Sequence, residues 1–188
     1  MRVIGGCAKG RKLAPFPGQE IRPTSDRIRE AVFNILFSRL GALAGKKVLD
    51  LFAGTGAMGL EALSRGASEA VFVEKNRHAA ALIGENLSHC RLETSARIVQ
   101  EEAHRALSGL AGNIFDLIFI DPPYGHDLVL PTLALIDQQK LLSPQGVICA
   151  EAGKMDEIPE TTGSLARIKK NVYGSTAIHF FGQAQKSA

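Results

Sequence analysis

Two short motifs have residue types and spacings that suit chemistry on a nucleotide-like ligand. Residues 50–59 read Asp-Leu-Phe-Ala-Gly-Thr-Gly-Ala-Met-Gly, and residues 121–124 read Asp-Pro-Pro-Tyr. In the first motif Gly54, Gly56 and Gly59 have the spacing G-x-G-x-x-G. Such a turn lets the backbone approach a ligand and points helix N-terminal N–H groups at it. That spacing usually indicates a dinucleotide site, so the surrounding residues must decide which ligand is bound.

The second motif combines two fixed acceptors with a flat ring. Its prolines restrict the backbone after a buried strand, so the Asp121 carboxylate and the Pro122 carbonyl become fixed hydrogen-bond acceptors. Tyr124 offers a face for stacking. Together these three candidate catalytic residues suit a planar group that carries an amine, such as a flipped or unpaired base. A rigid turn with a capping Asp is the alternative explanation.

Other polar residues are expected beside these motifs, because ligands of an open parallel sheet bind at the carboxyl ends of its strands. Glu74 lies twenty residues after Gly54, where a carboxylate can accept hydrogen bonds from ribose hydroxyls; the alternative is a surface Glu at a strand end. Glu102 is expected either near an adenine amino group or in solvent. The residues expected to contact a cofactor are Asp50, Phe52, Ala53, Gly54, Thr55, Gly56, Gly59, Glu74, Lys75, Glu102, Ala103 and Asp121.

Strand and helix patterns alternate along most of the chain. We expect strands at 47–52, 70–74, 96–99, 115–120 and 146–150. We expect helices at about 57–65, 76–90, 102–110 and 127–138. This order predicts a mostly parallel sheet with helices on both faces. Two alternating segments at 165–173 and 176–181 surround Gly174-Ser175 and predict a C-terminal antiparallel hairpin, which makes seven strands in a Rossmann-like α/β fold.

The start of the chain has a different character. Residues 1–23 are rich in Gly, Pro and basic side chains and predict an arm outside the core, with a short hairpin. A helix is expected to begin at Thr24 or Ser25, with an apolar stripe of Ile28, Val32, Ile35, Leu36 and Leu40. We therefore expect a basic arm at 1–23, one domain at 24–182 and a frayed tail at 183–188.

The net charge of +3 is unevenly distributed. Residues 1–47 hold ten Lys or Arg and three acids, whereas the rest of the chain holds 12 bases and 16 acids. A basic segment on an acidic domain favours a polyanionic partner, although a solvated face would look the same. The residues expected to contact RNA are Arg2, Lys9, Arg11, Lys12, Arg22, Thr24 and Arg27.

Composition also excludes some classes of protein. No apolar run reaches the ~18 residues needed to span a membrane, and the N-terminus lacks the apolar stretch of a signal peptide, so a cytoplasmic location is expected. Cys7, Cys90 and Cys149 form no C-x-x-C pair, and the five histidines have no metal spacing. We expect neither a disulfide framework nor a metal site.

Residues 50–59 resemble the first motif of class I S-adenosylmethionine-dependent methyltransferases. Residues 121–124 resemble the (D/N)-P-P-(Y/F) motif of members that methylate exocyclic or amide nitrogens. Residues 22–36 resemble the segment before the first strand in bacterial RsmD-type small-subunit rRNA guanine-N2 methyltransferases, and Tyr173-Gly174 resembles that family's final hairpin. Glu101-Glu102-Ala103 departs from the Asp-Ala found there in many methyltransferases.

The resemblance implies S-adenosylmethionine as cofactor and 16S rRNA, within a partly assembled small ribosomal subunit, as the partner of a monomeric enzyme. It places the methionine portion near Asp50 and the glycine turn, and the ribose on Glu74. The N2 amine of a guanine would enter between Asp121, the Pro122 carbonyl and Tyr124. Methyl transfer would be a direct displacement, catalysed mainly by alignment and by the acceptors. The acids Asp50 and Asp121 suit the cationic sulfonium.

Other functions stay open at this point. An NAD-dependent dehydrogenase explains the glycines and Glu74, but not Asp50, residues 121–124 or the basic arm. An RNA-binding module without catalysis explains the arm alone. An adenine-N6 methyltransferase suits Asp-Pro-Pro-Tyr but needs a target-recognition region, for which the chain leaves little room. A glutamine-amide methyltransferase fits the Asp at position 121 and the basic arm less well.

Overall fold

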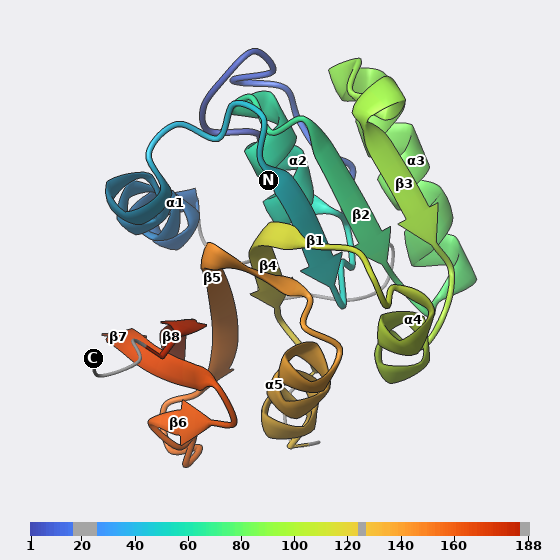
Figure 1. The fold of residues 1–188 in the computed structure, drawn as a ribbon. Coiled ribbons are helices and arrows are strands. Elements are labelled where there is room, and N and C mark those ends of the chain that lie inside the picture. The colour runs from blue at the N-terminus through green and yellow to red at the C-terminus, as the bar shows by residue number, and fades with distance from the viewer. Residues whose placement is uncertain (17–25, 124–126, 185–188) are drawn as a thin grey trace.

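The computed structural model describes residues 1–16, 26–123 and 127–184. An eight-stranded sheet with the order β3-β2-β1-β4-β5-β8-β7-β6 runs through the molecule (Figure 1). Its strands are β1 (Lys47–Leu51), β2 (Glu69–Val73), β3 (Ala96–Val99), β4 (Phe115–Ile120), β5 (Leu142–Gly153), β6 (Thr161–Thr162), β7 (Leu165–Tyr173) and β8 (Thr176–Gln183). Strands β1 to β5 pair in parallel, and the last three strands are antiparallel. The predicted mostly parallel sheet with a C-terminal hairpin is confirmed, and the two-residue β6 adds an eighth strand at its edge.

Helices cover both faces of the sheet, as the alternating pattern predicted. One apolar cluster joins the sheet to α1 (Asp26–Leu40), α2 (Ala57–Ser64) and α3 (Arg77–Cys90). The other joins it to α4 (Ala103–Gly109) and α5 (Val129–Gln138). A short 3-10 helix, η1 (Glu93–Ser95), precedes β3. From Leu117 to Ile120, successive residues of β4 alternate between the two clusters, because side chains of a strand point to opposite faces.

The strand order reverses next to β1, and this reversal positions the site. From β1 the chain moves outward to β2 and β3, then returns to β4 on the other side of β1. Leu51 at the end of β1 pairs with Ile120 at the end of β4. The glycine turn after β1 and the Asp-Pro-Pro sequence after β4 therefore begin side by side at a topological switch point, where α/β proteins bind ligands.

Helix α1 buries a different stripe from the one predicted. Val32 and Leu36 are buried as expected, whereas Ile28, Ile35 and Leu40 are only partly buried. Arg29 and Phe33 are almost fully buried instead. The Arg29 guanidinium donates to the Arg2 carbonyl and to Asp26 Oδ1, the latter at 2.9 Å, so N-terminal polar groups compensate its charge.

The N-terminal segment, residues 1–16, belongs to the core rather than forming a free arm. The predicted hairpin is present as a bridge between Arg2 and Lys12, but Val3, Ala8 and Leu13 are buried in the same cluster as α1 and α2. The expectation of an arm outside the core is therefore wrong for these residues.

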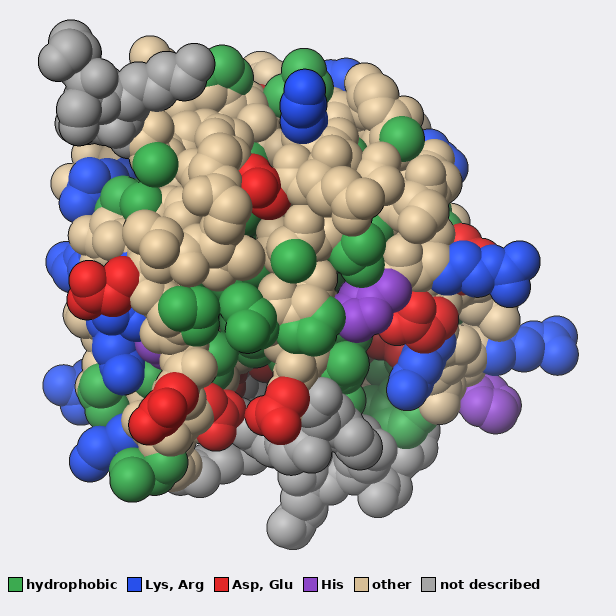
Figure 2. All heavy atoms as spheres, turned by 60° about the horizontal axis from the view of Figure 1, so that its bottom comes forward, with side chains coloured by type: hydrophobic (Ala, Val, Ile, Leu, Met, Phe, Trp, Pro, Cys, Tyr) green, Lys and Arg blue, Asp and Glu red, His purple; other side chains and the backbone are tan. Residues whose placement is uncertain are grey.

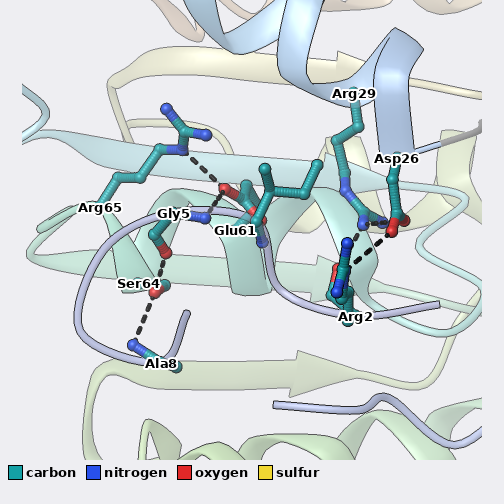
Figure 3. A network of polar contacts seen from close by, with 9 residues as sticks. Arg2, Gly5, Ala8, Asp26, Arg29, Glu61, Ser64 and Arg65 are labelled. Atoms are coloured by element: carbon teal, nitrogen blue, oxygen red, sulfur yellow. Dashed lines mark hydrogen bonds and ion pairs between the residues drawn. The ribbon is translucent and has the colours of Figure 1, made fainter. Parts of the chain in front are cut away.

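Polar side chains of α2 satisfy the backbone of this segment (Figure 3). Glu61, which is fully buried, accepts the N–H groups of Ile4 at 2.7 Å and Gly5 at 2.8 Å. Ser64 Oγ accepts the N–H of Ala8 at 2.9 Å. These acceptors let a Gly-rich segment pack against a helix without leaving buried N–H groups unpaired.

Several boundaries differ from the predicted ones. Strand β5 begins four residues before the expected 146 and ends three after 150, and Gln183, placed in the frayed tail, is the last residue of β8. The Asn76 cap of α3 is confirmed, since its Oδ1 accepts the N–H groups of His78 and Ala79. The expected caps Thr24 and Ser25 lie outside the described residues. Among the described helices, none is long and apolar enough to cross a membrane.

Candidate active site

The turn after β1 adopts a backbone that favours glycine at several positions. Gly54 and Gly56 have φ angles of 56° and 78°. Phe52 also has a positive φ, 60°, which is unusual for a residue with a large side chain and marks local strain. The turn is fixed by Ala53, whose N–H donates to the Val73 carbonyl at 3.0 Å, and Gly56 then caps the start of α2.

Asp50 lies under this turn and holds the first turn of α2. It is 2% exposed, and its Oδ2 accepts the N–H of Gly59 at 2.8 Å. Burial raises the pKa of Asp50 to about 7; the nearby Glu74 carboxylate adds to the rise, and the Gly59 hydrogen bond opposes it. Gly59 was expected to contact the cofactor, but its N–H is occupied by Asp50. A Cβ on Gly59 would lie 2.3 Å from the Phe72 ring, so close packing requires glycine there.

Glu74 lies directly against the glycine turn, as its position after β2 predicted. Its Oε2 accepts the N–H of Gly54 at 2.9 Å, and its Oε1 accepts the N–H of Asn76 at 2.8 Å. The carboxylate therefore bridges the ends of β1 and β2 and remains half-buried. Lys75, the next residue, is exposed.

Asp121 and Pro122 follow β4 on the other side of the turn. Pro122 is buried and Asp121 is exposed. Desolvation by the surrounding protein raises the pKa of Asp121, and the carboxylates of Glu151 and Asp50 raise this pKa further. Solvent screens the effect of the two carboxylates, because the residue is exposed. Tyr124 lies outside the described residues.

Glu102 has a structural function that the sequence analysis did not assign to it. Its side chain accepts the N–H of Arg105 at 3.1 Å and so caps α4, and it is exposed. Ala103 behind it is buried. Both residues follow β3 at the same edge of the sheet as Glu74, which pairs its backbone N–H with the Val99 carbonyl at 3.1 Å.

Two residues near the site were missed by the sequence analysis. Glu151 follows Ala150, which pairs with Ile120, so it stands beside Asp121 at the sheet edge. The strand-end rule that selected Glu74 would also have selected it. Asn86 is 2% exposed and contacts the glycine turn through Thr55. Asn86 lies between Ile83 and Leu87 on the apolar face of α3. A polar residue at such a position could have been recognised from the sequence as a buried hydrogen-bonding group.

The structure brings three of the expected RNA-binding residues together. Arg2, Lys9 and Arg27 line a cleft of about 360 Å³ between the N-terminal segment and α1, with Asp26 and Glu30 also in its wall. The rest of the lining is Val3, Ile4 and Gly10.

The other expected RNA-binding residues lie outside this cleft. Arg11 donates to the His89 carbonyl at 2.6 Å, which anchors the segment to α3, and Lys12 is exposed. Arg22 and Thr24 fall outside the described residues.

The face at the bottom of Figure 1 carries side chains of both signs of charge (Figure 2). Most Lys and Arg side chains stand along its left and right margins, and Asp and Glu side chains stand both among them and nearer the middle. Within the described ranges, no group of three His, Cys, Asp or Glu side chains is placed to hold a metal ion.

Known proteins share both this sequence and this fold. The family model described as "Conserved hypothetical protein 95" matches residues 1–182. The YlbH protein of Bacillus subtilis is 38% identical over 183 residues, which cover 96% of this chain and 98% of YlbH. Ribosomal RNA small subunit methyltransferase D of Escherichia coli is 32% identical over 181 residues, which cover 96% of this chain and 89% of that protein.

A solved structure agrees with these matches. The yhhF protein of Escherichia coli superposes with a TM-score of 0.86 over 99% of each chain, at 32% sequence identity. The predicted class I methyltransferase fold is thereby confirmed, including the C-terminal hairpin. The chain belongs to the family of conserved hypothetical protein 95, the RsmD-type methyltransferases.

Proposed function

We propose that this protein transfers a methyl group from S-adenosylmethionine to the exocyclic N2 amine of a guanine in 16S rRNA. The observation that carries the proposal is the pairing of Leu51 with Ile120. It sets the glycine turn and Glu74 on one side of a narrow rim and Asp121-Pro122 on the other. The Escherichia coli relative is named as a small-subunit rRNA methyltransferase, and a partly assembled small subunit in the cytoplasm is the expected substrate.

The charges of the site suit a cationic cofactor. Desolvation is the main cause of the raised pKa values of Asp50 and Asp121, and neighbouring carboxylates add to each rise. A site that concentrates negative charge in this way favours a bound cation and disfavours the pyrophosphate of a dinucleotide. S-adenosylmethionine carries that positive charge on its sulfonium, and it supplies the methyl group for displacement. In this proposal Glu74 accepts the ribose hydroxyls, and the turn from Phe52 to Gly56 faces the methionine portion.

On the acceptor side, the chain orients an amine and receives its proton. The Asp121 carboxylate and the Pro122 carbonyl accept the two amine hydrogens, which directs the nitrogen lone pair toward the methyl group. The nitrogen–carbon bond forms as the sulfur–carbon bond breaks, and one amine proton passes to Asp121. The raised pKa of Asp121 makes it a better proton acceptor than an ordinary carboxylate. Tyr124 is assigned the stacking face on the basis of the sequence motif.

Methyl transfer into rRNA tests the proposal directly. Small subunits from a strain lacking the enzyme are incubated with radiolabelled S-adenosylmethionine, and the modified base is mapped by mass spectrometry. Wild-type enzyme should label guanine N2, and Asp121→Asn should lower turnover at least about 100-fold, while RNA affinity stays unchanged and cofactor affinity falls far less than turnover. Asp116→Asn, at the opposite end of β4, is the matched control. Label on adenine N6, or no label in RNA, would contradict the proposal.

A second measurement addresses the base and the competing cofactor. Tyr124→Ala should lower turnover more than cofactor affinity, whereas Tyr124→Phe, which keeps the ring, should retain most of the turnover. Unchanged turnover in Tyr124→Ala would remove the stacking role.

Calorimetric titration with S-adenosylmethionine and with NADH should show binding of S-adenosylmethionine alone. Binding of NADH would instead support the dehydrogenase alternative.

A further inference from the structure

A second cleft lies farther along α1 than the first, between the C-terminal half of this helix and β7. It measures about 510 Å³ and is lined by Asn34, Ile35, Ser38 and Arg39 of α1 and by Lys169 of β7. Two of these side chains are cationic and two are uncharged hydrogen-bonding groups. No Asp or Glu of the described residues lines it. Its lining therefore favours an anion.

An irregularity in β7 is what turns Lys169 toward α1. The pairing of β7 with β8 shifts between Arg167 and Lys169. Arg167 pairs with Phe181, which belongs to the α5-side cluster, whereas Lys169 pairs with Phe180, which belongs to the α1-side cluster. In a regular strand Arg167 and Lys169 would share one face of the sheet. The bulge between them therefore places Lys169 on the face that α1 covers.

An exposed aromatic ring stands beside this cleft. Phe37 is 64% exposed, although its neighbours Phe33 and Leu36 on α1 are buried. It lies three residues after Asn34, so the two side chains share one side of the helix. The core does not use the Phe37 ring, which leaves its faces free to contact a ligand. Exposed rings next to cations are the usual platform for unpaired bases.

The surface continues along α1 toward the first basic cleft. The helix is fifteen residues long, or roughly 22 Å, and Arg27 near its start lines the cleft that also contains Arg2 and Lys9. Glu30 is the exposed acid between them. Cations thus stand at both ends of one helix, with Phe37 near the second end.

We propose that Asn34, Phe37, Ser38, Arg39 and Lys169, here called the α1–β7 surface, bind an unpaired segment of the RNA substrate. Arg39 and Lys169 contact phosphates, and one base stacks on Phe37. The inference rests on the proposed function and extends it, because neither Phe37 nor Lys169 belongs to the glycine turn, the Asp-Pro-Pro sequence or the N-terminal segment. A single strand fits better than a duplex, since a stacking ring requires an unpaired base.

Salt-dependent RNA binding separates the two kinds of contact. Binding of purified 16S rRNA, of polyuridylate and of a duplex RNA is measured between 50 and 200 mM salt, roughly the range in which phosphate contacts dominate. Phe37→Ala should weaken polyuridylate binding about tenfold with an unchanged salt slope. Arg39→Gln with Lys169→Gln should lower the slope by roughly 0.7 for each phosphate that the protein no longer neutralises. The exposed pair Arg97→Gln and Lys154→Gln is the control and should change neither.

The outcomes are distinct from those that decide the proposed function. Methyl transfer by the wild type decides that function, whereas the difference between variants decides the α1–β7 surface. Variants that bind 16S rRNA and polyuridylate as tightly as the wild type does would overturn the inference. A Phe37→Ala variant that loses as much affinity for duplex RNA as for polyuridylate would also overturn it. A wild type that binds none of the three RNAs would also overturn it. Because Phe37, Arg39 and Lys169 are exposed, unchanged circular dichroism should show that all variants fold.

Discussion

The side-chain amide of Asn86 donates to the carbonyl oxygen of Thr55 at 3.0 Å. The oxygen of the same amide accepts the N–H of Ala14 at 2.8 Å. Thr55 lies between the two glycines of the turn, and Ala14 lies near the end of the N-terminal segment. One buried amide on α3 therefore connects a segment expected to contact RNA with the turn proposed to hold the cofactor.

Removing this amide should weaken both attachments. Asn86→Ala leaves the part-buried N–H of Ala14 and the buried carbonyl of Thr55 without their partner, so the free energy of unfolding should fall by about 1–3 kcal/mol. Asn86→Asp keeps the acceptor for Ala14 and loses the donor to Thr55, so it should lower cofactor affinity while the N-terminal segment stays attached. Urea unfolding, calorimetric cofactor titration and limited proteolysis measure these three effects. Cofactor affinity equal to wild type in Asn86→Asp would show that the turn does not depend on this bond.

The sequence predicted the parts of this molecule that depend on local pattern. Strands β3 and β4 have the predicted boundaries, and the Glu74–Gly54 contact follows from strand ends meeting at one edge. The sequence did not predict the burial of the N-terminal segment. That burial depends on Glu61 and Ser64, two polar residues of α2 whose partners lie 56 or more positions earlier in the chain. The residue pattern within α2, or within the N-terminal segment, does not indicate that these two parts of the chain pair with each other.

The predicted role of Glu102 shows a second limit of the sequence. A strand-end carboxylate has the same pattern whether it contacts a ligand, as proposed for Glu74, or caps a helix. Glu102 caps α4 in the structure, and only the position of the following helix distinguishes the two cases. The α1 stripe failed for a related reason: Arg29 is buried because a carbonyl of the N-terminal segment and Asp26 are close enough to pair with it.

Gly59 should not tolerate even one added carbon. Its backbone is ordinary, but a Cβ would meet the Phe72 ring at 2.3 Å, well inside contact distance. Gly59→Ala should therefore lower the free energy of unfolding by about 1–3 kcal/mol through overpacking. It should also disturb the bond to Asp50 and weaken cofactor binding.

Gly84 provides the matched control, because it is a helical glycine with room. A Cβ there would meet its nearest atom, Ile98 Cδ1, at 3.8 Å. Gly84→Ala should raise the free energy of unfolding by roughly 0.5–1 kcal/mol, since alanine suits a helix interior better. Chemical denaturation of both variants checks the pair. Equal changes in the two would mean that the Phe72 contact does not decide the outcome at Gly59.

The exposed cations of the N-terminal segment should set part of the salt dependence of RNA binding. Lys9→Gln combined with Lys12→Gln should weaken binding to 16S rRNA and flatten its salt slope, because fewer counterions are released. Arg11→Gln differs, since it removes a hydrogen bond to the His89 carbonyl and should also loosen the segment. Filter binding over a salt series checks the first, and limited proteolysis checks the second. A salt slope equal to that of the wild type would show that Lys9 and Lys12 are solvated and do not contact RNA phosphates.

Cofactor affinity should increase with pH, and Asp50 should be the main cause. Because burial raises the pKa of Asp50 to about 7 from an ordinary 3.8, the folded protein without ligand favours its protonated form. The contribution of protonated Asp50 to the free energy of unfolding is complete below pH 3.8 and is lost as the pH rises through about 7. A shift of this size corresponds to roughly 4 kcal/mol at most.

A cationic cofactor reverses that preference, since it favours the ionised carboxylate. Below pH 7, binding should therefore release close to one proton, and affinity should rise about tenfold per pH unit before levelling off above it. Calorimetry in two buffers of different ionisation enthalpy measures the released proton. Asp50→Asn keeps an acceptor for the Gly59 N–H but cannot ionise, so its affinity should be lower and nearly flat with pH. An equally steep rise in Asp50→Asn would move the titrating group to Asp121, whose pKa is also raised.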